Sequence, residues 1–241
     1  MTTKKTTTDT KKAEPSNRAT EVTIAERFTG FLQKNRVPLL VVTATLIVAI
    51  VALFVTIEIL NTRQQEATVL AERVQRRFDA WLEASDEARP AIREEIDRMI
   101  DETVSRYSRS YGATRALFIR GRLAWESEQY EDARVAFERL ADRFSRSHLA
   151  PTALFNAAVA AEAGADPDGS ERILTRIVDQ YGTDSIESPR ALFNLGRLAE
   201  EAGRYDDAGA RYNRLIEEYA GSSWTNLARN RIIFLTVNGL L

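Results

Sequence analysis

The sequence predicts an all-α fold: a solenoid of antiparallel helix hairpins preceded by one transmembrane helix. Three observations support this prediction. A long apolar run lies near the N-terminus, apolar residues recur at helical spacing through the rest of the chain, and three segments of the C-terminal half align with one another without a gap. Self-alignment at a fixed period is the signature of a repeat architecture. The helical spacing makes the repeated element a pair of helices.

The composition excludes several classes of protein. The 241 residues include 33 Lys and Arg against 35 Asp and Glu, for a net charge of −2. Every lysine precedes the apolar run, and the remainder uses arginine in slight deficit to the acids, so it lacks the basic face that phosphate contacts require. We therefore expect no nucleic-acid partner. The chain has no cysteine, which excludes disulfides, thiolate nucleophiles and cysteine metal sites.

The N-terminal region is predicted to be a tail followed by a membrane anchor. Residues 1–36 are expected to form a disordered cytoplasmic tail, because the first twenty are rich in Thr and Lys and poor in large apolar side chains. Residues 37–60 are expected to form a transmembrane helix, since about 20 apolar residues span a bilayer core. A cleaved signal peptide is the alternative, but its apolar region is usually shorter, about 7–15 residues.

Basic residues near the ends of the span predict its orientation. Lys34 and Arg36 abut its N-terminal end, whereas Arg63 stands alone on the other side until Arg73. Basic residues favour the cytoplasmic side. The sequence therefore predicts a single-pass protein of the bacterial inner membrane, with the N-terminus in the cytoplasm and the C-terminal domain in the periplasm.

Three repeats are expected within residues 111–222. Their aligned segments begin at Arg115, Thr152 and Arg190, which lie 37 and 38 residues apart. Each segment contains two helices, and the second is expected to begin at Tyr130 or Tyr205 in the outer copies and at Pro167 in the middle copy. The middle of each first helix carries a small residue that lets the second helix approach closely: Gly121, Ala158 and Gly196.

The repeat continues in degenerate form on both sides. Residues 61–110 are predicted to form a stalk and a degenerate first hairpin, with helices near 63–85 and 88–109. The first of these helices is expected to bear four large apolar side chains on one face: Leu70, Val74, Phe78 and Trp81. Residues 223–241 are predicted to form a C-terminal capping helix. Three of its apolar residues either seal the last hairpin or dock a partner: Ile232, Ile233 and Phe234.

The stretch LGRLAEEAGRYDDAGARYNRL (195–215) resembles the tetratricopeptide repeat through its pattern of Leu, Gly, Tyr, Ala and an aromatic residue. The resemblance covers residues 115–222. It implies a right-handed solenoid that binds other proteins and catalyses nothing. With the membrane anchor, the chain is similar to the ancillary subunit of the bacterial Sec translocon and to other periplasmic repeat proteins of envelope assembly.

The resemblance also implies a set of partner-binding residues. Peptide-binding members of the family line their concave face with residues near the second, fifth, sixth and ninth positions of each unit. These positions correspond here to Arg115, Phe118, Ile119, Arg122, Thr152, Phe155, Asn156, Val159, Arg190, Phe193, Asn194 and Arg197. Asn can pair with a peptide backbone, Arg with a carboxylate, and Phe can form apolar pockets. The alternative is that Phe118, Phe155 and Phe193 pack between neighbouring hairpins.

No catalytic, cofactor or metal site is expected. The single histidine, His148, lies in a linker, where a solvated or locally hydrogen-bonded role is typical. A cluster of acidic residues lacks the ligand spacing and the glycine of a calcium loop, so we interpret it as a solvated face: Glu126, Glu128, Glu131 and Asp132. The chain also has no glycine-rich phosphate loop. We therefore expect no enzymatic activity.

The functional hypothesis is a membrane-anchored scaffold or chaperone-recruiting adaptor that binds other proteins in the cell envelope. The alternative is a structural subunit of a large envelope machine, such as a flagellar or secretion assembly. In that case residues 63–85 would drive self-association.

Overall fold

The computed structural model describes residues 24–241, and every regular element in this range is a helix. The chain divides after Glu58 into two compact units, which we call the N-terminal unit and the repeat unit (59–241). The elements are α1 (Ile24–Lys34), α2 (Arg36–Glu83), α3 (Arg89–Arg106), α4 (Tyr111–Glu126), α5 (Tyr130–Arg143), α6 (Leu149–Ala163), α7 (Pro167–Tyr181), a 3₁₀ turn (Gly182–Asp184), α8 (Ser188–Glu201), α9 (Tyr205–Glu218) and α10 (Ser223–Val237).

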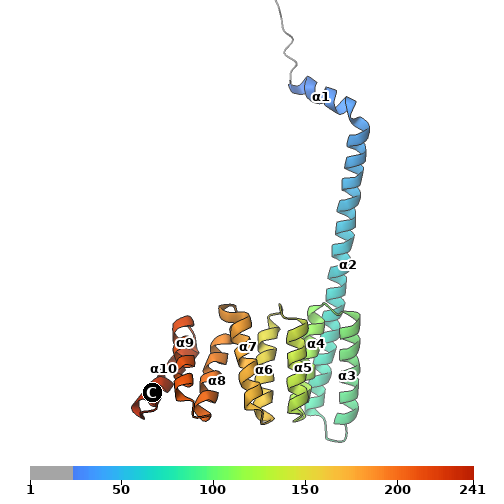
Figure 1. Cartoon of the computed structure of the whole chain (residues 1–241). Coiled ribbons are helices and arrows are strands. Elements are labelled where there is room, and N and C mark those ends of the chain that lie inside the picture. The colour runs from blue at the N-terminus through green and yellow to red at the C-terminus, as the bar shows by residue number, and fades with distance from the viewer. Residues whose placement is uncertain (1–23) are drawn as a thin grey trace, which may run out of the picture. The chain divides into compact units, whose positions relative to one another are not determined.

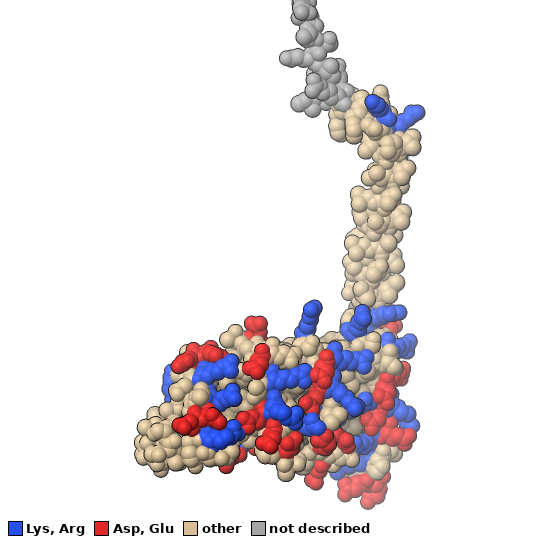
Figure 2. Space-filling model, in the orientation of Figure 1, with Lys and Arg blue, Asp and Glu red and all other residues tan. Residues whose placement is uncertain are grey.

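The described part of the N-terminal unit consists of α1 and the first part of α2. That part of α2 contains a window with a mean hydropathy of 2.9 in which no residue is buried. The hydroxyls of Thr45 and Thr56 donate to backbone carbonyls one turn earlier, each at 2.8 Å, so their polarity is satisfied within the helix. Figure 2 shows the stretch without charged side chains. By length and composition, it is the one helix among residues 24–241 that could cross a membrane.

The predicted tail needs a correction. Residues 24–34 form α1, so the disorder expected for residues 1–36 does not extend over this part, while residues 1–23 lie outside the described range. Phe28, Phe31 and Leu32 recur at helical spacing. This local pattern favours a helix, although the composition of the tail as a whole is polar.

The repeat unit is an all-α solenoid of antiparallel hairpins, as predicted. Figure 1 shows α3 to α10 side by side in chain order, and the pairs α4–α5, α6–α7 and α8–α9 are the three expected repeats. Tyr130 and Tyr205 are the first residues of α5 and α9, as expected. Asp166 caps α7 by accepting a hydrogen bond from the backbone N–H of Gly169 at 2.9 Å, and Pro167 is the first residue of that helix.

The predicted stalk does not form a separate element. The expected span (37–60) and the first helix of the degenerate hairpin (63–85) are parts of one continuous helix, α2. After Pro38 the sequence has no glycine or proline until Pro90, so nothing interrupts the helix.

The last part of α2 packs within its own chain. Val74, Phe78 and Trp81 are buried in one core with Ile96 and Ile100 of α3. Three of the four large apolar residues expected on this face are therefore covered within the chain, whereas Val69 and Leu82 of the same stretch are 47% and 39% exposed. Self-association through residues 63–85 stays a prediction. Leu70, expected on the same face, is half-buried.

The small residues in the first helices determine how closely each hairpin closes. A Cβ atom on Gly121 would lie 2.5 Å from the Phe137 ring, and one on Gly196 would lie 2.4 Å from the Tyr212 ring. Both distances are far inside van der Waals contact, so the rings of α5 and α9 occupy the space that a side chain on α4 or α8 would fill. The close approach expected from the sequence is present in both hairpins.

The turn inside each hairpin repeats one backbone motif. Glu128, Ala165 and Gly203 occupy equivalent positions and have positive φ angles of 57°, 63° and 70°. In each turn the next residue donates its N–H to a carbonyl five residues earlier, at 2.8–2.9 Å. This arrangement is the Schellman motif, in which the left-handed residue is usually glycine. Two of the three turns therefore place a side chain in a strained conformation.

We expect Ala165→Gly to raise the free energy of unfolding by about 0.5–1 kcal/mol, because it removes the left-handed penalty at a modest cost in chain entropy. Urea unfolding of the full chain in a non-ionic detergent, followed by tryptophan fluorescence, measures the change. The matched control is Ala210→Gly on the exposed surface of α9, which should lower stability by about 1 kcal/mol. A loss of stability in both variants would contradict the prediction.

Glu200 joins α8 to α9 and α10. Its side chain is only 9% exposed, and it forms an ion pair with Arg231. The Tyr212 hydroxyl donates to Glu200 Oε1 at 2.6 Å, and Arg231 Nε donates to the same oxygen at 3.0 Å. Burial alone would raise the pKa of the Glu200 carboxyl, but these hydrogen bonds outweigh it and leave the pKa below its ordinary value. Burial and the bond to Glu200 raise the pKa of Tyr212.

We expect Glu200→Gln to destabilise the chain by about 1–2 kcal/mol at pH 7, a charged hydrogen-bond contribution reduced by the exposure of Arg231. Because the folded pKa is lowered, the contribution of Glu200 is complete above its unfolded pKa of about 4.3 and is lost as the pH falls through the folded value. The difference from the unmodified chain should therefore shrink between about pH 5 and pH 3. Glu217→Gln, on the exposed face of α9, is the control, and a difference independent of pH would disprove the assignment.

The C-terminal helix seals the last hairpin only in part. Leu235 and Ala228 are buried and Ile232 is partly buried, whereas Ile233 and Phe234 are 61% and 49% exposed. Of the three apolar residues expected to seal the hairpin or dock a partner, two therefore remain on the surface.

Candidate partner-binding groove

A hollow of about 400 Å³ lies between the first helices of successive hairpins. Residues from α4, α6 and α8 line it, together with one ring from α5. They are Phe118, Arg122, Trp125, Glu126, Phe137, Phe155, Asn156, Val159 and Arg190. We call this hollow the groove.

Helical spacing and the hairpin contact build the groove. Phe118, Arg122 and Trp125 are four and three residues apart, so they share one face of α4. Phe137 reaches this face from α5 because Gly121 has no side chain in its way. Its ring meets that of Phe118 edge to face, with centroids 5.3 Å apart. The glycine that closes the hairpin therefore also admits an aromatic ring to the groove.

The groove carries more positive than negative charge. The Arg190 guanidinium lies 3.8 Å from the centroid of the Phe155 ring, and its Nη1 atom is 3.7 Å from Glu187. Arg122 lies over Phe78, 4.7 Å from the centroid, and no carboxylate of the described chain lies within ion-pair distance of it. Glu126 is the one acidic residue in the lining, and it is exposed. An anionic group would therefore find an unpaired guanidinium beside aromatic rings.

The groove brings together half of the twelve residues that the sequence nominated. These six are Phe118, Arg122, Phe155, Asn156, Val159 and Arg190. Val159 is 37% exposed and Phe155 only 3%. Among residues 24–241, the side chain of Asn156 has no hydrogen-bond partner, although its backbone belongs to α6. The side-chain amide is therefore available to a ligand.

The other six nominated residues do not line the groove. Three of them contact the side chains of other residues. Thr152 donates a hydrogen bond to Glu187 at 3.1 Å, and Arg197 forms ion pairs with Glu162 and Glu201. The ring of Phe193 packs against those of Tyr212 and Trp224. The remainder are Ile119, which is buried, Asn194, which donates to the Arg190 carbonyl, and Arg115, which is half-buried.

Three groove residues were not nominated from the sequence. Trp125 lies three residues after Arg122 on the same stripe of α4, and this spacing could have identified it. Phe137 belongs to α5, contacts Gly121 and is 2% exposed. Glu126 was expected on a solvated face, and it is on the surface.

Side chains that could support other chemistry are dispersed. Within the described range, no three His, Asp or Glu side chains are arranged to hold a metal ion. His148 is exposed, and its Nε2 atom lies 3.3 Å from the Tyr111 hydroxyl. The partner lies 37 residues earlier, at the start of the preceding hairpin, so this contact joins two hairpins.

Comparisons with known proteins agree with the geometry. Residues 118–185 and 163–223 match the model of the tetratricopeptide repeat family. The chain is also 32% identical, over 112 residues, to a TPR repeat-containing protein of Treponema pallidum (strain Nichols), and the match covers 46% of each protein. The chain thus spans about half the length of this relative. Residues 118–223 are thus similar to tetratricopeptide repeats, and such repeats indicate a protein–protein interaction module.

Proposed function

We propose that this chain is a membrane-anchored protein-interaction scaffold or adaptor of the bacterial cell envelope, with α2 in the inner membrane and the repeat unit in the periplasm. The groove carries the proposal, because it combines apolar rings, an unpaired guanidinium and a free amide on repeats of a protein-interaction family. The fitting partner is a peptide segment with an apolar side chain and a carboxylate. Phe118 and Trp125 would receive the side chain, and Arg122 the carboxylate.

The first part of α2 supports the anchor. Its apolar window has no buried residue, and such a surface is costly in water but favourable in lipid. Lys34 and Arg36 precede the window, which favours a cytoplasmic N-terminus. The repeat unit would then lie on the opposite side of the membrane.

A structural subunit of a larger envelope assembly is the second candidate. α10 leaves Ile233, Phe234 and Val237 exposed, the last by 80%. The end of a solenoid needs a polar cap unless another surface covers it. Stoichiometry separates the two candidates, because an adaptor purifies as a monomer or dimer with its partners and a structural subunit purifies in a fixed ratio with its assembly.

The orientation predicts a labelling pattern. The chain has no cysteine, so Asp168→Cys in the repeat unit and Thr7→Cys in the tail each introduce one reporter. In spheroplasts of a Gram-negative host, a membrane-impermeant maleimide should label the cysteine at position 168, and label that at position 7 only after lysis. Labelling in the reverse order would contradict the orientation. Release of the chain by an alkaline carbonate wash would contradict the anchor.

The groove predicts site-specific capture of the partner. A photo-crosslinking residue at Val159 should give a discrete adduct in cells, and the same residue at Arg172 on the exposed surface of α7 should not. Adding Arg122→Gln should reduce the adduct at position 159 about tenfold or more, because a charged hydrogen bond contributes about 1.5–3 kcal/mol. Adding Arg172→Gln should leave it unchanged. Equal capture at both positions, or capture insensitive to Arg122, would disprove the groove.

A further inference from the structure

A second cavity lies at the ends of the hairpins, away from the groove. It has a volume of about 490 Å³ and lies between the loop that joins α3 to α4 and the loop that joins α5 to α6. Its lining consists of Arg109, Ser110, Tyr111, Thr114, Arg143, Phe144, Ser145, Arg146, Ser147 and His148. Three arginines and several hydroxyls line this cavity without any carboxylate.

The arginines of this cavity are free of acidic partners. Arg109 and Arg146 are exposed, and within residues 24–241 neither is hydrogen-bonded or ion-paired. Arg143 makes a long hydrogen bond of 3.4 Å to the Ser108 carbonyl and lies beside the Phe144 ring. Several other arginines of the repeat unit reach across to carboxylates of neighbouring helices, as Arg197 does to Glu162. The cavity therefore concentrates cations whose counter-ions are absent from the described chain.

A duplicated pentapeptide produces this concentration of charge. Residues 106–110 read RYSRS and residues 143–147 read RFSRS, 37 residues apart, which is the period of the repeat. The equivalent stretches of the next two loops, QYGTD (180–184) and EYAGS (218–222), contain no arginine. The basic cavity is thus confined to one end of the row of loops and is not a general property of the fold.

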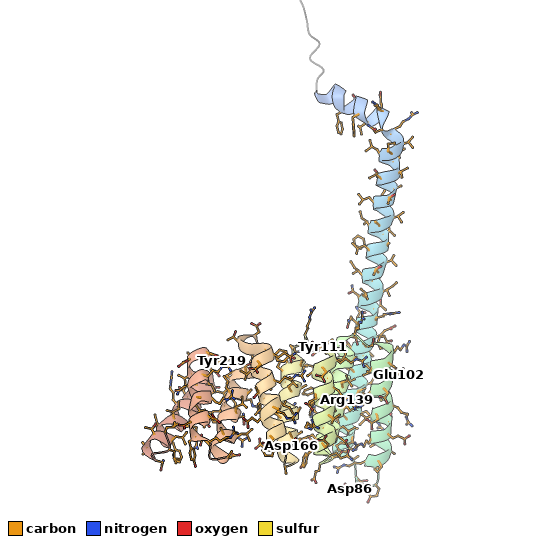
Figure 3. All side chains as sticks on the ribbon, in the orientation of Figure 1. Asp86, Glu102, Tyr111, Arg139, Asp166 and Tyr219 are labelled. Atoms are coloured by element: carbon orange, nitrogen blue, oxygen red, sulfur yellow. The ribbon has the colours of Figure 1, made fainter. Side chains whose placement is uncertain are left out.

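The cavity lies where the repeat unit joins the apolar segment. Arg109 and Ser110 also line an adjacent hollow that Leu60 and Arg63 share. Leu60 is the last residue of the apolar stretch. Figure 3 places Tyr111, at the rim of the cavity, at the opposite end of the hairpins from Asp86 and Asp166. If the stretch before Leu60 crosses a bilayer, chain connectivity alone keeps Arg109 close to the headgroup layer, which is about 5–7 Å deep.

We propose that this cavity binds the phosphate of an anionic phospholipid and so holds the first hairpins at the membrane surface. The inference rests on the proposed membrane span. Guanidinium groups bind phosphate oxygens through paired N–H donors, and the hydroxyls of Ser145, Ser147 and Tyr111 can donate to the remaining oxygens. The proximity of Leu60 favours a lipid over a phosphorylated peptide, because a lipid headgroup is held at that boundary.

The test uses the full chain in nanodiscs of equal phosphatidylglycerol and phosphatidylcholine. After mild extraction, native mass spectrometry counts the lipids that stay bound. The unmodified chain should retain phosphatidylglycerol in excess, and Arg109→Gln/Arg146→Gln should lose this preference by about tenfold or more, since each arginine near an anionic surface contributes a severalfold effect. Arg109→Lys/Arg146→Lys keeps the charge and should retain part of the preference.

The control for lost charge is Arg139→Gln/Arg172→Gln, because both arginines are exposed, lie outside the cavity and have no ion-pair partner among residues 24–241. This variant should behave as the unmodified chain. Since all four substituted residues are exposed, the helical circular dichroism spectrum should be the same in every variant.

The outcomes distinguish the inference from the proposed function. A chain that enters nanodiscs but shows no preference, or one whose preference survives Arg109→Gln/Arg146→Gln, would overturn lipid binding and leave the anchor standing. A chain that fails to enter nanodiscs would overturn both. If the detergent-solubilised chain instead binds inorganic phosphate or a phosphoserine peptide through Arg109 and Arg146 and shows no lipid preference, the cavity is a soluble-phosphate site and the lipid is excluded.

Discussion

The contact between an aromatic ring and a glycine inside a hairpin is the constraint on which the rest of the repeat unit depends. Phe137 over Gly121 and Tyr212 over Gly196 set the separation of their helices. The middle hairpin has Ala158 and Leu174 at the equivalent positions, both buried. Ala158 is slightly larger than the glycine of the outer hairpins, and Leu174 is smaller than their aromatic ring. The total side-chain volume is therefore nearly conserved, and volume-conserving exchanges are tolerated best. The groove depends on this contact too, because the ring of Phe137 beside Gly121 is part of its lining.

The elements that the sequence predicted correctly are those in which local and long-range signals agree. The starts of α5, α7 and α9 follow from a tyrosine or a capped proline, and the period of 37–38 residues fixes which helices pair. The errors arise in α2, where one continuous helix has an apolar, exposed first part and a last part that packs in the repeat unit. Hydropathy changes at Leu60, and it therefore predicts a boundary between two elements there. No helix breaker lies at this point, so the backbone of α2 continues through it as one helix.

The groove was only half predictable for a related reason. Repeat positions identify the side of α4, α6 and α8 that can face a ligand, but the next hairpin decides which of those side chains stay free. Phe155 is a nominated residue that lines the groove, yet Arg190 of α8 covers its ring. Phe193 has the equivalent position in α8, but Trp224 of α10 lies against it and removes it from the groove. The sequence of a single repeat does not reveal which of these side chains stay free, because contacts with the next repeat decide it.

Both candidate binding surfaces lie at the first of the three repeats and its junctions, and both depend on departures from the repeat. The groove uses Trp125, where the next two copies have Glu162 and Glu200, and each of these glutamates pairs with an arginine of a later helix. The basic cavity uses the arginine-rich pentapeptide that the later loops lack. Ion pairs also join the first helices, as between Arg77 and Glu95 and between Arg120 and Asp101. Among residues 24–241, however, the arginines that line the two hollows of the first repeat and its junctions lack such partners: Arg109, Arg122, Arg143 and Arg146. Because these guanidinium groups line hollows and have no counter-ion within the described chain, they favour ligand binding at the first repeat and its junctions.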